Sequence, residues 1–260
     1  MKKLLMLLIA LLLTGCTVLG NEEKTLEGIQ TNGTIVVGTS ADYPPYEFHK
    51  EIDGVDTIVG FDVALAEKVA EDLGVELKIV DMSFDGLLPA LIGGKIDFIA
   101  AGMTPTDERK ESVDFSSIYY DTSQTMLVLN ENASKLNTIE SFSGLKIGVQ
   151  KATLQEMIFD EQFDGAEKVA IAKIPNLVME LQSGKIDGII LAEVVANQYA
   201  DANENIAVNG LDLGSEGGVA IAINKGHEEL LEAINKTIDT VLDDGTLDQY
   251  ILDAMALSEE

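Results

Sequence analysis

The sequence predicts an α/β protein made of two doubly wound lobes that are joined by a two-strand hinge. Strands and helices alternate along the chain, and the alternation restarts once, which indicates two similar halves. A short repeat supports this division, because Gly94–Asp97 and Gly184–Asp187 have the same four-residue sequence and both follow a predicted helix. The alternation predicts a parallel sheet with right-handed crossovers in each half.

The first half contains three predicted strands and two predicted helices. Short apolar runs predict strands at 35–37, 75–80 and 96–101. A helix is expected from Asp62, whose carboxylate is able to cap it, to Leu73, and Gly74 marks its end. Ser83 is the expected cap of a second helix that continues to Leu91.

The second half repeats this order of elements. Strands are expected at 145–149, 169–171 and 186–191, and helices at 153–163 and 175–182. The remaining chain predicts a strand at 217–224 and helices at 228–242 and 246–257. These last elements are too few to form a third sheet, so they must join an existing lobe.

The return of the chain makes the first lobe discontinuous. We expect lobe 1 to comprise residues 31–123 and 217–260, and lobe 2 to comprise residues 124–216. The chain then crosses between the lobes near 122–126 and again near 212–218, and the two crossings form a hinge. A cleft between hinged lobes is able to engulf a small ligand.

The N-terminus has the pattern of an export signal. Two lysines precede an apolar run at 4–13, which is shorter than the roughly 20 apolar residues of a transmembrane helix. We therefore expect residues 1–15 to be a cleaved signal peptide. The sequence around Cys16 resembles a bacterial lipobox, which implies that Cys16 is lipidated and that residues 16–30 tether an extracytoplasmic protein to the membrane. The alternative is a stray thiol in a discarded signal.

The composition argues against several classes of partner. The net charge is −28, and so acidic a chain lacks the clustered basic residues with which proteins bind nucleic acid. The charges are spread along the sequence, which favours a solvated surface over a specific attraction for cationic ligands. Cys16 is the only cysteine, so no internal disulfide is expected.

The sequence also lacks patterns for cofactor or metal chemistry. The two histidines, His49 and His227, lie far apart in polar segments, so we expect neither a zinc triad nor a histidine-based catalytic dyad. No phosphate-binding loop or dinucleotide fingerprint follows a predicted strand. The acidic residues around Asp53 lack the spacing of a calcium loop, and Asp53-Gly54 is more simply a hairpin turn.

Four motifs resemble the polar amino-acid-binding proteins of ABC importers, which are extracellular solute-binding proteins with a type II periplasmic-binding fold. They lie at residues 40–48, 60–62, 84–91 and 104–109. The resemblance implies a monomeric binding protein, not an enzyme, that delivers a polar amino acid to a membrane permease and its ATPase. The first and third motifs are closest to arginine-binding members, which favours arginine or a similar cationic amino acid, with glutamine or another polar amino acid next.

The resemblance places the carboxylate of the ligand at Arg109. The hydroxyl of Thr104 and the backbone amides near Ala101 and Gly102 are expected beside it, since glycine allows close approach of the backbone. A guanidinium binds a carboxylate through two parallel hydrogen bonds, as a lysine cannot. From sequence alone, the alternative for Arg109 is a charge on a helix surface.

Tyr43 and Phe84 are the expected aromatic walls of the site. An aromatic face attracts a guanidinium or ammonium group by about 0.5–2 kcal/mol. The competing interpretation is that both are ordinary core residues, although turn residues follow each of them. Glu47 is expected either to neutralise a cationic ligand side chain or to face solvent.

The second lobe is expected to close the site with Gln150, Thr153 and the backbone of Leu154, at a helix start whose amides are free to bind oxygen. Two positions depart from the pattern of the family. Ala192 stands where many members carry the aspartate that binds the ligand ammonium, and Glu193 either replaces that aspartate or points into solvent. Ser40 stands where several members have an aspartate that contacts the ligand side chain. Both departures leave the identity of the ligand open.

Two other functions share this type of fold, because some relatives are dehydratases or sensor domains. Turnover of a bound cyclic acid would favour a dehydratase. A kinase gene beside this one, in place of permease and ATPase genes, would favour a sensor.

Overall fold

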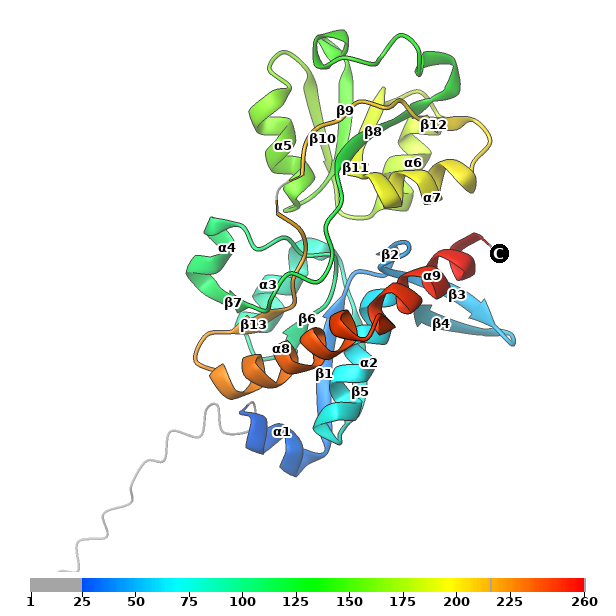
Figure 1. Ribbon diagram of the computed structural model, residues 1–260. Helices are drawn as coiled ribbons and strands as arrows, with labels where there is room; N and C mark the ends of the chain where they lie inside the picture. The colour runs from blue at the N-terminus through cyan, green and yellow to red at the C-terminus, as the bar shows by residue number, and fades with distance from the viewer. Residues whose placement is uncertain (1–24, 216, 260) are drawn as a thin grey trace, which may run out of the picture.

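The computed structural model describes residues 25–215 and 217–259, which form two lobes with a five-stranded sheet in each (Figure 1). This architecture confirms the two-lobed α/β fold class. The predicted signal peptide and Cys16 lie outside the described residues. None of the described helices combines the length and the apolar composition that crossing a membrane requires.

Lobe 1 is built on a sheet with the strand order β5-β1-β6-β13-β7. The strands are β5 (Glu76–Asp81), β1 (Thr34–Thr39), β6 (Phe98–Ile99), β13 (Ala222–Asn224) and β7 (Val113–Phe115). The helices are α1 (Leu26–Asn32), α2 (Phe61–Leu73), α3 (Phe84–Ile92), α4 (Asp107–Ser112), α8 (Glu228–Asp243) and α9 (Thr246–Glu259). Helices α8 and α9 pack against α2, so the end of the chain covers one face of lobe 1 (Figure 1).

Lobe 2 has the strand order β10-β9-β11-β8-β12. The strands are β10 (Glu167–Ile171), β9 (Lys146–Gln150), β11 (Gly188–Ala192), β8 (Gln124–Leu129) and β12 (Ile206–Val208). The helices are α5 (Leu154–Gln162), α6 (Ile174–Gln182) and α7 (Glu193–Asp201), with short 3-10 turns at Asn130–Asn132 and Ile139–Phe142. All five strands come from one continuous stretch of the chain.

Both sheets are mixed, which corrects the expectation of parallel sheets. In lobe 1, β13 pairs antiparallel with β6 and β7, and in lobe 2, β8 pairs antiparallel with β11 and β12. The physical reason is the route of the chain. Strands β8 and β13 enter their sheets from the interlobe crossings and not through a helical crossover, and only parallel neighbours need such a crossover.

The two crossings lie side by side. Tyr120 and Val219 form an antiparallel bridge, and the amide of Gln124 donates to the carbonyl of Gly214 at 2.8 Å. A small third sheet of β2 (Asp42–Tyr43), β3 (Glu47–Ile52) and β4 (Val55–Val59) extends from lobe 1. Its β3–β4 turn confirms the predicted Asp53-Gly54 hairpin, because both residues have positive φ angles of 53° and 78°.

Several element starts differ from the sequence predictions, among them that of the strand expected at 217–224, which begins only at Ala222. Residues 26–32 form α1 with Ile29 only 1% exposed, so the last part of the predicted tether packs against lobe 1. Helix α2 begins at Phe61 after Gly60, not at Asp62. Gly60 has φ 136°, and a Cβ there would lie 2.0 Å from the carbonyl oxygen of Tyr46, so only glycine fits this position.

The repeated sequence Gly-Lys-Ile-Asp forms the same joint in both lobes. Gly94 and Gly184 end helices α3 and α6 with φ angles of 67° and 68°. The carboxylates of Asp97 and Asp187 then each accept a hydrogen bond, at 2.8 Å, from a strand of their own lobe, at the amides of Val36 in β1 and Lys146 in β9 respectively. The two halves of the chain are therefore built around equivalent helix-to-strand joints.

Candidate ligand-binding site between the lobes

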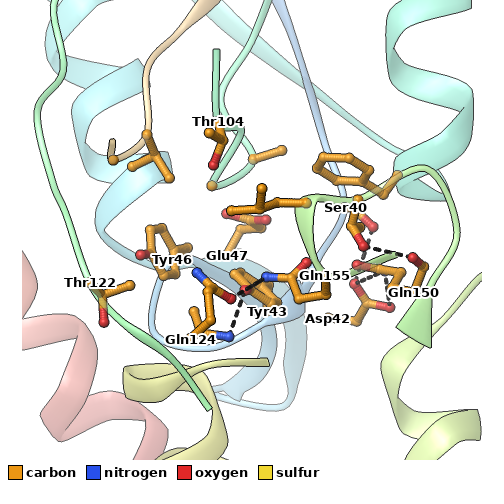
Figure 2. A pocket seen from close by; sticks show the side chains of 18 of the residues that line it. Ser40, Asp42, Tyr43, Tyr46, Glu47, Thr104, Thr122, Gln124, Gln150 and Gln155 are labelled. Atoms are coloured by element: carbon orange, nitrogen blue, oxygen red, sulfur yellow. Dashed lines mark hydrogen bonds between the residues drawn. The ribbon is translucent and has the colours of Figure 1, made fainter. Parts of the chain in front are cut away.

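A pocket lies between the lobes and is lined by residues of both (Figure 2). Its empty space is about 550 Å³, which includes solvent at its mouth. Most of the residues that the sequence singled out line it: Ser40, Tyr43, Glu47, Phe84, Ala101, Gly102, Thr104, Arg109, Gln150, Thr153 and Leu154. The loops that follow the sheet strands of both lobes bring these positions together, although they are far apart in the sequence.

Arg109 is a buried cation and not a surface charge. Helix α4 begins behind the cap Thr106, whose hydroxyl accepts the amide of Arg109, and turns this side chain inward so that only 7% of the residue is exposed. Its Nη1 donates to the carbonyl of Thr104 and its Nη2 to that of Ala152 in lobe 2, each at 2.7 Å. The guanidinium carbon also lies 5.3 Å from the ring centre of Phe84.

The electrostatics of Arg109 suit an anionic guest. Burial lowers the pKa of Arg109 to about 10, so the side chain stays protonated at neutral pH. No described carboxylate lies within ion-pair distance of its guanidinium. A buried charge without a counter-charge is costly, and a carboxylate ligand would remove that cost.

Glu47 is buried in the pocket wall and does not face solvent. It is 1% exposed, and its Oε2 atom has no hydrogen-bond partner in the protein. Burial raises the pKa of Glu47 well above its usual range, and the nearby carboxylates of Asp62 and Asp42 raise it further. An unpaired buried oxygen of this kind is favourable only when a donor from outside the chain reaches it.

Asp62 holds the backbone of the pocket wall in place. Its Oδ2 accepts the amide of Gly102 at 2.8 Å, and its Oδ1 accepts the hydroxyl of Tyr119 at 2.8 Å. The amide of Gly102 is therefore already bonded, which corrects the expectation that it is available to a ligand carboxylate. Burial raises the pKa of Asp62 to about 7.

The rings of Tyr43 and Phe84 both line the pocket, and Tyr43 also bonds across the cleft. Its hydroxyl accepts hydrogen bonds from the Nε2 of Gln155 at 3.1 Å and from the amide of Ala192 at 3.3 Å. Gln155 Nε2 also donates to the side-chain oxygen of Gln124 at 2.8 Å (Figure 2). The backbone amide of Ala192 is thus held by an uncharged hydroxyl of the other lobe.

The start of helix α5 forms the lobe 2 side of the site. Thr153 caps the helix by accepting the amide of Glu156, and its hydroxyl donates to the carbonyl of Gln150 at 2.7 Å. The first-turn amides at and after Leu154 have no partners within the helix, which makes this end suitable for an anionic oxygen.

Glu193 does not line the pocket. Its carboxylate accepts a hydrogen bond from the hydroxyl of Ser123, outside the lining of the pocket. The sequence reasoning missed further lining residues: Asp42, Tyr46, Asp121, Thr122, Gln124, Gln155, Gly218 and Val219. Asp42 and Tyr46 lie inside the motif at residues 40–48, so the motif could have identified them as lining residues. The others belong to the crossings or to lobe 2, where no sequence motif marks them.

Comparison with protein families decides the identity of the fold and its general role. The model of the bacterial extracellular solute-binding proteins, family 3, matches residues 35–253. The chain belongs to this family. The match includes all pocket residues and the strands of both lobes.

Individual relatives agree with this assignment. The arginine-binding extracellular protein ArtP of Bacillus subtilis is 34% identical over 96% of each chain. A probable histidine-binding protein of Campylobacter jejuni is 35% identical over 93% of this chain and 92% of its own. The crystal structure of AbpA, an amino acid ABC transporter substrate-binding protein from Streptococcus pneumoniae bound to L-arginine, has a TM-score of 0.87 at 34% identity and covers 90% of this chain and 99% of its own.

Proposed function

We propose that this chain is the substrate-binding protein of an amino acid ABC transporter and that it captures a cationic amino acid, arginine first, between its lobes. The observation that carries the ligand class is the pair of buried, incompletely satisfied groups in one pocket. Arg109 is a buried cation without an acidic partner, and Glu47 is a buried carboxyl group with an unpartnered oxygen. A molecule with a carboxylate at one end and a cation at the other satisfies both groups.

The remaining lining residues support this orientation. Arg109, Thr104 and the first amides of α5 hold the ligand carboxylate, while Tyr43 and Phe84 flank the aliphatic stem. Three carboxyl groups and one guanidinium line the pocket, and the acidic residues are Asp42, Glu47 and Asp121. This excess of acidic groups favours a cationic amino acid over glutamine, which is the next candidate.

The relatives also support a cationic ligand. The two relatives described above are named for arginine and histidine, and the solved structure contains L-arginine. The bound amino acid bridges the lobes and shifts the protein to a closed form that the permease and ATPase complex recognises. The protein acts as a monomer and captures its ligand without chemical change. Conversion of a bound cyclic acid would instead favour the dehydratase alternative.

Calorimetric titration with L-arginine, L-lysine, L-histidine and L-glutamine tests the proposal. We expect L-arginine to bind with a Kd in roughly the micromolar range or below, corresponding to about −8 kcal/mol. Tighter binding of L-glutamine than of L-arginine would reject the cationic ligand class. A Kd weaker than about 1 mM for every amino acid would reject the binding function itself.

The same proposal includes a lipid anchor at Cys16, outside the described residues, on the basis of the lipobox-like sequence. Growth with an alkyne fatty acid should label the wild-type protein in the membrane fraction. Cys16→Ala should lose the label and leave the membrane fraction, because one thiol carries the anchor. Equal labelling of both proteins would reject the anchor and leave the ligand site unaffected.

A further inference from the structure

Strand β2 of lobe 1 makes a cluster of direct hydrogen bonds to lobe 2. Its two residues, Asp42 and Tyr43, accept hydrogen bonds from five groups of lobe 2 among the described residues. The donors are the side chains of Gln150, Gln155 and Tyr199 and the amides of Ile174 and Ala192. These bonds exist in addition to any bond that a ligand makes.

The carboxylate of Asp42 caps a helix that belongs to the other lobe. Its Oδ2 accepts the amide of Ile174, the first residue of α6, at 3.0 Å. The local cap residue of α6, Lys173, makes no side-chain capping bond, so this helix end takes its acceptor from lobe 1. A carboxylate at a helix N-terminus is favoured both by the free amides and by the helix dipole.

The surroundings of Asp42 hold its carboxylate in this position. The hydroxyl of Ser40 donates to its Oδ1 at 3.1 Å, and the Nε2 of Gln150 lies 3.4 Å from both oxygens (Figure 2). The hydroxyl of Tyr199 on α7 donates to the backbone carbonyl of Asp42 at 2.8 Å. Asp42 is buried, so these bonds form where water competes little.

A second, weaker contact lies beside this one. The Nζ of Lys173 lies 3.4 Å from Asp81 and 3.3 Å from the carbonyl of Met82, both in lobe 1. These groups are about one third exposed, so the ion pair contributes little on its own. It brings a positive charge to the same helix end that Asp42 caps.

We infer that Asp42 is a positioning residue that holds the lobes together by capping α6 across the cleft. We call Asp42, Tyr199 and the amide of Ile174 the interlobe clasp. The clasp supplies part of the free energy of closure from the protein itself, so a ligand needs to supply only the rest. Because Tyr43 directly follows Asp42, the clasp also fixes the aromatic wall of the site against lobe 2.

Amide hydrogen exchange of the full chain without ligand tests the clasp. The reporter is the amide of Ala192, which bonds to the hydroxyl of Tyr43 across the cleft and makes no bond to Asp42. We expect Asp42→Ala to accelerate exchange at Ala192 at least tenfold, because the lobes separate more often. Asp53→Ala, which removes the same carboxylate from the exposed β3–β4 turn, is the matched control and should leave the rate unchanged.

The same experiment separates closure from a local role. Faster exchange at Ile174 alone, with an unchanged rate at Ala192, would mean that Asp42 only caps a helix and would overturn the proposal. Tyr199→Phe keeps the ring and the carboxylate but removes one bond of the clasp, so it should accelerate exchange at Ala192 by a smaller factor. An unchanged rate in both variants would also overturn the proposal, and this second variant serves if Asp42→Ala folds poorly.

A binding measurement extends the test and depends on the proposed function. The Kd for L-arginine should increase at least tenfold in Asp42→Ala and stay the same in Asp53→Ala. Equal affinity in wild type and Asp42→Ala would contradict the clasp. If wild type binds no amino acid, the exchange measurement still decides the clasp, because it uses the protein alone.

Discussion

The two lobes share one framework but bring different chemistry to the pocket. Each has a five-stranded mixed sheet and the same glycine–aspartate joint between a helix and a strand. Lobe 1 supplies the guanidinium of Arg109, the carboxyl group of Glu47 and the rings of Tyr43 and Phe84. Lobe 2 supplies only uncharged groups to the pocket: Gln124, Gln150, Thr153, Leu154, Gln155 and Ala192.

This difference indicates a division of labour between similar structures. Charged groups give the largest differences in binding energy when they are buried, so lobe 1 selects the ligand. Amides and hydroxyls complete hydrogen bonds once water is excluded, so lobe 2 encloses a ligand that lobe 1 already holds. Variants in each lobe test this distinction.

The largest effect is expected for Arg109→Ala. It should weaken binding of L-arginine by at least about 2 kcal/mol, roughly 30-fold, because the ligand carboxylate loses its buried counter-charge. Gln155→Ala in lobe 2 should cost less than about 1 kcal/mol, the typical value for an uncharged hydrogen bond. Titration calorimetry of both variants gives the comparison, and equal losses would remove the distinction between the lobes.

Glu47→Gln should change selectivity and pH dependence together. A cationic ligand needs the ionised carboxylate, and burial raises the pKa of Glu47, so L-arginine should bind wild type more weakly as the pH falls. Glu47→Gln should bind L-arginine at least about tenfold more weakly at pH 8 and should lose most of this pH dependence. Titrations at pH 5.5 and pH 8 measure both effects, and an unchanged pH profile in the variant would assign the dependence to another group.

Asp62 should make the stability of lobe 1 depend on pH. Its pKa is about 7 in the folded protein against a usual value of 3.8, so the folded state binds more protons between these values. The contribution of Asp62 to the free energy of unfolding is therefore full at low pH and is lost as the pH rises, by about 2 kcal/mol between pH 5 and pH 7. Urea unfolding of wild type and Asp62→Asn at both pH values isolates this contribution, and parallel changes in the two proteins would contradict it.

Effects on stability alone are expected at the repeated joints, which do not line the pocket. Asp97→Ala and Asp187→Ala each leave a strand amide without its acceptor. We expect a loss in the free energy of unfolding of about 2 kcal/mol for the buried Asp97 and about 1 kcal/mol for the more exposed Asp187, because water replaces the lost bond more easily at the second site. Urea unfolding measures both losses, and a larger loss at Asp187 would reverse this order.

The order of the main elements was predictable because strong periodicity and glycine stops mark them. Helices α5, α6 and α8 begin and end within one or two residues of the predicted bounds. The sheets were predicted wrongly as parallel, because the antiparallel strand β8 was expected only as an interlobe crossing and not as a strand. An apolar pattern also does not encode the direction of the neighbouring strands. The three-stranded sheet was missed except for its turn, because β2 has only two residues and β4 has no buried residue.

The candidate site was predictable where a motif surrounds the residue. Arg109, Tyr43 and Glu47 lie within such motifs, and all three line the pocket. Gln155 belongs to the first turn of a helix and Thr122 to a crossing, and only the three-dimensional approach of the lobes gives them a place in the site. The sequence could not show whether the side chain of Glu193 points into the pocket, because this depends on its rotamer. In the structure, its carboxylate accepts a hydrogen bond from Ser123 instead.

The placement of β13 has a consequence for the assembly of the chain. This strand lies between β6 and β7 in the lobe 1 sheet, although it follows the whole of lobe 2 in the sequence. Lobe 2 is encoded without interruption, so it is able to fold as soon as residues 124–215 have emerged from the export machinery. Lobe 1 must wait, with one edge of β6 and the whole of β7 unpaired, until residues 222–224 arrive, and any truncation before that point leaves exposed strand edges that favour aggregation.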